Sequence, residues 1–400
     1  MTLFRIVFKS LRQHLLSTVV TALSLALAVG LLMSVWVVKE QSHATFTKVS
    51  GGYDAVLGAR GSKLQLVLNA IFHLEASPGN IRWSDYQTIK KHGAVELAIP
   101  LAVGDNYRGY RLVGTEPEMF EHAYSPGKTY EVESGGRLFE AGYKEAVVGS
   151  FAARRLGLKV RDQFNPYHGL IFNEDAMHKD IYVVVGILKP TSTPVDRVIW
   201  IPISGLQNMA GHDPKSATDV SAVLVKLRAP TAGFMMDQMY NKQGDKMTFA
   251  FPIGAVMAQL FDKIAWFDKI LELVAYLVAL VAIGSILASI YNSMNERRRD
   301  IAIMRALGAR RSTIFSAVVL EAAAIASLGV LLGFAFYAAI MTGAASIIRE
   351  QTGVVLEPFA GHPVMLWAPL GMIALGALAG VVPAFKAYRT HVAEYLSPVS

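Results

Sequence analysis

The sequence predicts a polytopic α-helical membrane protein with four transmembrane helices and a large α+β extracytoplasmic domain between helices 1 and 2. Charged residues are only 17% of the 400 residues and the mean hydropathy is +0.37, whereas soluble domains carry about 25% charge. Four long stretches are almost free of charge, and a bilayer core needs about 20 apolar helical residues. These observations exclude a disordered chain and a wholly water-soluble protein.

The four helices are predicted near residues 15–38, 270–292, 314–342 and 364–386. The first apolar run exceeds the about 7–15 residues of a signal-peptide core, so we expect a retained anchor rather than a cleaved leader. Apolar residues from Met257 onward recur at helical spacing and run into the second span without Gly or Pro. This pattern predicts one continuous helix that is longer than a bilayer needs.

Charge counts predict the orientation and three domains. Residues 1–14 carry net charge +3 and residues 292–313 carry +4, whereas residues 39–268 hold 25 Lys and Arg against 24 Asp and Glu. Because Lys and Arg collect on the cytoplasmic side, we expect both termini inside the cytoplasmic (inner) membrane. The first predicted domain is the N-terminus with helix 1 (1–38), and the second is the outside domain (39–268). The third is a permease domain (269–400) that contains a cytoplasmic loop at 293–313. This topology explains the sequence pI of 9.3, so no nucleic-acid partner is expected.

The outside domain shows mixed local signals. β-branched runs at 147–149, 181–186 and 222–227 predict strands. Helices are predicted from an N-cap at Ser84, and over 151–158 with Gly157 at the end. The apolar run 64–74 is too short to span a bilayer, which leaves a core helix or a helix at the membrane surface.

We predict no catalytic, cofactor-binding or metal-ligating residue. The chain has no cysteine, and no Ser lies in a G-x-S-x-G motif. His168, Glu174, Asp175 and His178 form the densest group of potential ligands, and Glu174 and His178 would share a face if this segment were helical. Scattered surface polar residues explain the group more simply than a metal site does.

The most informative stretch is the basic loop from Tyr291 to Phe315, YNSMNERRRDIAIMRALGARRSTIF. It predicts a short amphipathic helix on which Ile301, Met304 and Leu307 share a face, and Gly308 is placed to end it. Basicity alone would also fit an ordinary loop that obeys the positive-inside rule.

The whole loop pattern resembles the signature of the MacB and FtsX family of ABC transporter permeases. Residues 145–164 and 181–203 resemble the core of the MacB-type periplasmic domain, and residues 381–398 resemble the closing segment of the family. The resemblance implies that the loop contains a coupling helix that docks on an ATPase. The residues carried over as that coupling helix are Glu296, Arg297, Arg298, Asp300, Ile301, Met304, Arg305, Leu307 and Gly308.

The sequence has no G-x-x-x-x-G-K-[ST] motif, so the resemblance implies a separate P-loop ATPase that binds ATP and Mg. This chain is then not an enzyme and binds no cofactor. It would be the permease and mechanotransmission subunit, coupling ATP hydrolysis to movement of the outside domain for export or extraction of a substrate. Two ATPase copies imply a homodimer or a pair with a similar permease chain. Membrane lipids, and a periplasmic adaptor or lipoprotein, are further expected partners.

Three other functions remain open at this point. Two of them belong to the family, namely lipoprotein release and FtsX-like regulation of cell-wall hydrolases. In a different class, the chain would be a membrane-anchored extracytoplasmic sensor without transport.

Small and charged residues within the spans add two expectations. The pairs Gly329–Gly333 and Gly376–Gly380 have the i, i+4 spacing that allows close helix packing, although chance would also produce them in Gly-rich helices. Glu321 lies inside the third span, where a charge is costly. We expect it to reach the headgroups or to pair with an arginine of the loop, rather than to act at bilayer depth.

Overall fold

The structure is a computed structural model that describes residues 3–210 and 218–389. The end of the predicted closing segment, 390–398, lies outside the described residues. The chain divides into two compact units. The helical unit comprises Met1–Gln41, Ala265–Ser346 and Glu357–Ser400, and the sheet unit comprises Ser42–Ile264 and Ile347–Leu356.

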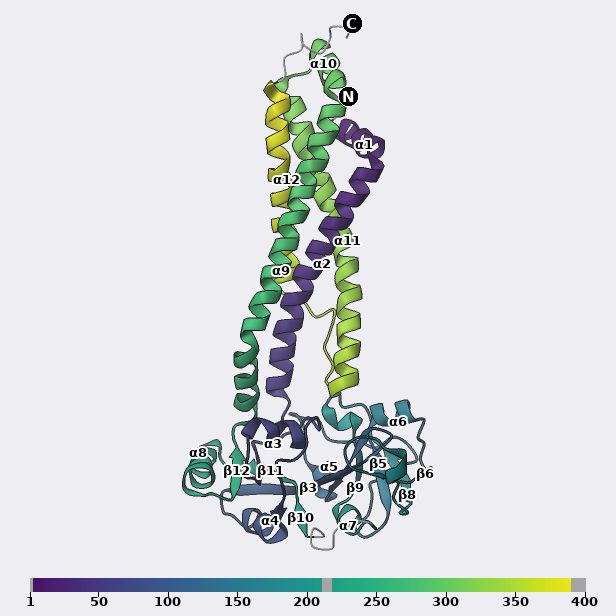
Figure 1. The fold of residues 1–400 in the computed structure, drawn as a ribbon, viewed down its shortest axis with the longest axis vertical. Coiled ribbons are helices and arrows are strands. Elements are labelled where there is room, and N and C mark those ends of the chain that lie inside the picture. The colour runs from purple at the N-terminus through teal and green to yellow at the C-terminus, as the bar shows by residue number, and fades with distance from the viewer. Residues whose placement is uncertain (1–2, 211–217, 390–400) are drawn as a thin grey trace. The chain divides into compact units, whose positions relative to one another are not determined.

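Four helices within the described residues are long and apolar enough to cross a membrane, which confirms the four predicted spans. They are drawn in Figure 1 as α2 (Leu15–Lys48), α9 (Ile253–Glu296), α11 (Arg311–Thr352) and α12 (Val364–Arg389). The 44 residues of α9 form one continuous helix, as the pattern from Met257 predicted. Helices α2, α9 and α11 each continue from residues of the helical unit into residues of the sheet unit.

Small residues let the helices of the helical unit approach closely. A Cβ atom added to Gly329 would lie 2.8 Å from Leu25 Cβ on α2, and one added to Gly333 would lie 3.0 Å from Val29 Cβ. On α12, a Cβ at Gly376 would lie 2.6 Å from Ala326 Cβ. Since real Cβ atoms do not approach this closely, these glycines set the spacing of α2, α11 and α12.

The sheet unit contains a ten-stranded mixed sheet in the order β12-β1-β11-β3-β4-β9-β5-β8-β6, with β7 paired to β3. Neighbours are antiparallel except for the pairs β4–β9 and β5–β8. A second, two-stranded sheet pairs β10 with β2. The strands are β1 (Ala55–Ala59), β2 (Ile81–Arg82), β3 (Val95–Tyr107), β4 (Tyr110–Thr115), β5 (Glu145–Val148), β6 (Gln163–Phe164), β7 (Tyr167–His168), β8 (Tyr182–Ile187), β9 (Ile199–Pro202), β10 (Asp219–Val220), β11 (Ala222–Leu227) and β12 (Met247–Ala250).

Helices cover both faces of the large sheet (Figure 1). Along β1, Val56 packs in one core with residues of α3, whereas Ala55 and Leu57 pack in another core with residues of α4, because successive side chains of a strand point to opposite faces. The helices of this unit are α3 (Lys63–Ala70), α4 (Trp83–Lys90), α5 (Glu118–Glu121), α6 (Ser150–Leu156), α7 (Ile203–Gln207) and α8 (Pro230–Gln238).

Most local predictions for this unit are confirmed. The three predicted strands are β5, β8 and β11, and α6 ends at Gly157, whose φ of +69° suits glycine. The apolar run 64–74 is a core helix with its following turn, because Leu66, Val67 and Phe72 are buried. The predicted N-cap is wrong: α4 is capped by Arg82, whose backbone N–H donates to Asp85 Oδ2 at 3.2 Å.

A buried histidine makes the stability of the sheet unit depend on pH. His73 packs edge-on against Trp200 with ring centroids 5.4 Å apart. Burial, together with the charges on Arg111 and Arg197, lowers the pKa of His73 to about 3. An unfolded histidine has a pKa of about 6.5, so the unfolded state binds more protons, and stability falls as the pH drops below that value.

We therefore predict that lowering the pH from 7 to 5 costs the sheet unit about 2 kcal/mol through His73. His73→Asn removes this proton uptake, and asparagine tolerates the backbone φ of +54° at this position. The measurement is thermal unfolding of the detergent-purified chain at both pH values. An equal pH-induced loss in the parent and His73→Asn chains would show that other groups cause it.

The glycine contacts yield a second prediction. Gly380→Ala places a Cβ 2.5 Å from Ala322 Cβ and should force α11 and α12 apart, whereas Gly371→Ala meets nothing within 4 Å. Overpacking of this kind costs about 1–3 kcal/mol, so the melting temperature should fall for Gly380→Ala. The control should be unchanged or slightly stabilised, since alanine favours helix. Equal melting temperatures for the two variants would refute the packing role.

Candidate functional site

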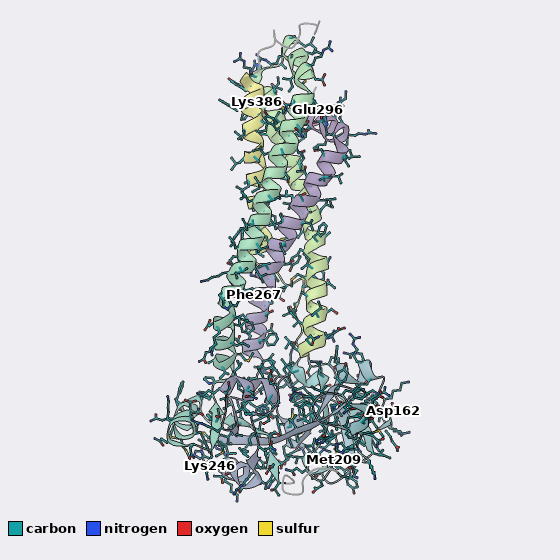
Figure 2. The ribbon with its side chains drawn as sticks, viewed as in Figure 1. Asp162, Met209, Lys246, Phe267, Glu296 and Lys386 are labelled. Carbon is teal, nitrogen blue, oxygen red and sulfur yellow. The ribbon has the colours of Figure 1, made fainter. Side chains whose placement is uncertain are left out.

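The predicted loop folds into a short helix, α10 (Arg298–Ala306), between α9 and α11. Helix α9 continues to Glu296, so the connection is shorter than the predicted loop at 293–313. Arg297 leaves helical geometry, with φ −104° and ψ 13°, and thereby separates the two helices. Gly308 follows the end of α10 with φ +99°, a value that favours glycine. Figure 2 shows Glu296 and Lys386 at the same end of the helical unit.

One face of α10 packs back onto its own unit. Ile301 is only 6% exposed and lies against Ile314 of α11, with Met294 of α9 and Met304 partly buried beside them. These contacts attach α10 to the ends of both neighbouring helices.

The opposite face carries apolar side chains exposed to solvent. Leu307 is 83% exposed and Ile303 is 42% exposed. Sequence spacing placed Ile301, Met304 and Leu307 on one docking face, but the structure turns Ile301 inward and leaves Met304 half-buried. Ile303 is the residue that this reasoning missed. Its i, i+4 spacing to Leu307 was present in the sequence, but two apolar rows on one short helix do not show which row faces outward.

A polar network fixes the beginning of α10. Glu321, buried on α11, accepts hydrogen bonds from Ser10 of α1 (Leu3–Gln13) and from Arg297 Nη1, the latter at 3.4 Å. Arg297 Nη1 also donates to Ser10 Oγ. The expectation that Glu321 pairs with an arginine of the loop is confirmed. A single carboxylate therefore joins α1, the α9–α10 turn and α11.

The remaining predicted coupling residues surround this arrangement. Glu296 is 3.3 Å from His14 Nδ1, and its side chain is 67% exposed. Asp300 is exposed, as is the neighbouring Arg299, whereas Arg305 is half-buried. The backbone of Arg298 begins α10, but its side chain lies outside the described part of the structure.

The outward surface of α10 combines exposed apolar and charged side chains. It offers two apolar side chains, Ile303 and Leu307, next to the exposed charges of Arg299 and Arg310. An apolar centre with a charged rim is the composition of a protein interface. The predicted residues thus include a short helix with an exposed apolar surface, held in place by the Arg297–Glu321 ion pair.

Comparison with known proteins gives two family matches. Residues 272–392 match the FtsX-like permease C-terminal family, and residues 18–233 match the MacB-like periplasmic core domain family. The second match alone spans more than half of the chain. The MacB-like match covers most of α2, and the FtsX-like match covers α11, α12 and the part of α9 from residue 272 onward; residues 234–271 lie between the two matches.

Curated relatives are similar at low identity. The macrolide export ATP-binding/permease protein MacB of Nitrobacter winogradskyi is 23% identical over 222 residues, covering 54% of this chain and 34% of that protein. The uncharacterized ABC transporter permease YvrN of Bacillus subtilis (strain 168) is 24% identical over 258 residues, covering 59% of this chain and 60% of that protein. The chain spans about a third to three-fifths of the length of these relatives.

One of the matched solved structures is a periplasmic domain. The periplasmic region of MacB from Actinobacillus actinomycetemcomitans aligns with a TM-score of 0.36 and 11% identity, over 55% of this chain and 98% of that one.

Proposed function

The chain belongs to the ABC transporter permeases that combine a MacB-like periplasmic core domain with an FtsX-like C-terminal domain, and we propose that it is the mechanotransmission subunit of such a transporter. In this proposal a separate P-loop ATPase binds ATP and Mg and docks on α10. The observation that carries the proposal is the exposed apolar pair Ile303, on α10, and Leu307, at its C-cap, opposite the face where Ile301 packs on Ile314.

The charge distribution supports a cytoplasmic position for α10. Residues 292–313 carry net charge +4, and Lys and Arg favour the cytoplasmic side. Both termini then lie in the cytoplasm, and the sheet unit lies outside the inner membrane. This topology places α10 where ATP is available and the sheet unit where a periplasmic substrate, adaptor or lipoprotein would be handled.

The proposed assembly contains two permease chains and two ATPase subunits. Each chain offers one docking helix among its described residues, and an ATPase dimer with two equivalent faces needs two such helices. A homodimer satisfies this symmetry most simply, and a pair with a similar permease chain also would.

The proposed mechanism is mechanical. Closure of the ATPase dimer moves α10, and the packing of Ile301 on Ile314, together with the Arg297–Glu321 pair, passes that movement to α9 and α11. Because α9 is one helix over 44 residues and reaches residues of the sheet unit, displacement of its cytoplasmic end is carried along its length. The outside domain then expels or extracts its substrate.

We predict that Leu307→Asp abolishes stimulation of the partner ATPase by the permease. A charge placed in an apolar docking site loses the buried contact, and truncation at such an interface commonly costs about 2 kcal/mol or more, which is about a thirtyfold loss of affinity. The measurement is ATP hydrolysis by the complex reconstituted in lipid, as a function of permease concentration.

Leu307→Met is the matched control, because it keeps an apolar side chain of similar size and should keep stimulation. Membrane insertion is measured separately for each variant. If Leu307→Asp and Ile303→Asp both stimulated the ATPase fully, the basic segment would be only a topological signal and the docking proposal would fail.

A further inference from the structure

Three potential metal ligands converge in the sheet unit, away from α10 in sequence. They are Asp105, His168 and His178, and their ligand atoms all lie within 4.8 Å of one another. Asp105 Oδ1 is 3.3 Å from His168 Nδ1 and 3.4 Å from His178 Nε2. Both imidazole rings therefore face the same carboxylate oxygen.

The fold itself brings the three residues together. Strand β7 pairs antiparallel with β3, and this register places His168 directly opposite Asp105. The β3–β4 pairing shifts register between Val103 and Asp105, and an irregularity of this kind re-aims the side chains that follow it. His178 is added by the bridge between Tyr167 and Met177. The trio could not be recognised from sequence spacing because its members come from three different segments.

The three residues differ in their exposure to solvent. Asp105 is fully buried and His178 is 6% exposed, whereas the side chain of His168 is 60% exposed. An ion could therefore reach the carboxylate from solvent along the His168 side.

Hydrogen bonding fixes which nitrogen of His178 faces Asp105. His178 Nδ1 lies 2.8 Å from the Ala210 carbonyl oxygen, and because a carbonyl only accepts, Nδ1 must carry the hydrogen. In the neutral ring, Nε2 then presents its lone pair to the Asp105 carboxylate. A cation between this nitrogen and the carboxylate would be coordinated by both.

The distances are compatible with a metal cation between the ligands. A charge-assisted hydrogen bond between imidazolium and carboxylate should measure about 2.7–2.9 Å, shorter than the 3.3 and 3.4 Å observed. A tetrahedral zinc ion about 2.0–2.1 Å from each ligand separates any two ligand atoms by about 3.3–3.4 Å. The two contacts thus match the ligand spacing of a tetrahedral ion.

Surrounding hydrogen bonds hold the ligand segments in place. The Asn165 amide donates to the backbone carbonyls of His178 and Asp180, at 3.1 and 3.0 Å. The Ala210 N–H donates to Asp180 Oδ2 at 2.9 Å, which positions the carbonyl that orients His178. The buried Asn106 amide donates to the Gly169 carbonyl at 2.8 Å, next to His168. Such second partners orient the ligands of natural metal sites.

We propose that Asp105, His168 and His178 form a binding site for a divalent transition ion of the zinc class. Two imidazoles and one carboxylate suit zinc better than calcium or magnesium, which prefer all-oxygen ligands. Three protein ligands leave the fourth tetrahedral position for water or for an exchanging ligand.

This site differs from the group weighed in the sequence. Glu174 and Asp175 are exposed and lie in a short 3-10 helix (Glu174–Ala176) rather than an α-helix, so Glu174 and His178 do not share a helical face. The prediction that no metal-ligating residue is present is revised by this proposal, with Asp105 as the ligand that sequence spacing did not reveal.

Zinc titration of the full-length chain tests the site. The chain is purified in detergent without a histidine tag, stripped with a chelator and titrated against a chromophoric zinc competitor. We predict one Zn²⁺ per chain in this site, and a zinc-dependent rise in melting temperature by mass action. Asp105→Asn and His168→Gln should each lower the affinity about tenfold or more, since even changes to second partners have effects of about that size.

A control variant and a fallback variant accompany the titration. His92→Gln changes a histidine that accepts a backbone hydrogen bond from Ala94 elsewhere in the sheet unit, and it should bind zinc as the parent does. His168→Gln decides the matter if Asp105→Asn fails to fold, because His168 is largely exposed. Cobalt should give the intense visible bands of a tetrahedral site. Absence of zinc binding by the parent chain, or unchanged affinity in His168→Gln, would overturn the proposal.

Discussion

A carboxylate inside an apolar helix needs a charged or hydrogen-bonding partner. The partners of Glu321 connect the helices at one end of the helical unit. An isolated charge at bilayer depth costs about 2.5–3.5 kcal/mol or more, and Arg297 and Ser10 supply its partners. Because Arg297 lies between the last residue of α9 and the first residue of α10, the same contact fixes where α10 begins. Ile301 and Ile314 complete the attachment, so the row that contains Ile303 and Leu307 is left to face outward.

The helices behind this end are closely packed. Glycines on α11 and α12 remove the side chains that would separate them from their neighbours, and close backbone approach replaces the hydrophobic driving force that lipid does not provide. Lys39 and Glu272, 2.6 Å apart, tie α2 to α9 within the same unit. Lengths of 34, 44 and 42 residues exceed the about 20 that a bilayer requires, so α2, α9 and α11 are each longer than a bilayer span.

The sequence predicted the features that depend on composition and period. The four spans, the continuous α9, three strands and the pairing of Glu321 are all visible in runs of apolar residues or in isolated charges. It did not predict the inward turn of Ile301, because α10 has apolar residues on two sides and only its packing on Ile314 chooses between them. It also missed Asp105, since a bulged strand and the β3–β7 register place this residue beside His168 and His178.

The central claim is that α9 transmits movement from α10 to the sheet unit. Lys263, exposed on α9, is a suitable position at which to interrupt that path, since proline there removes a backbone hydrogen bond and kinks the helix. The measurement is the ATP-dependent change in amide hydrogen exchange of the sheet unit in the complex with the ATPase. The account predicts that this change persists in Lys263→Ala and disappears in Lys263→Pro, with ATPase docking retained. An unchanged response in Lys263→Pro would contradict it.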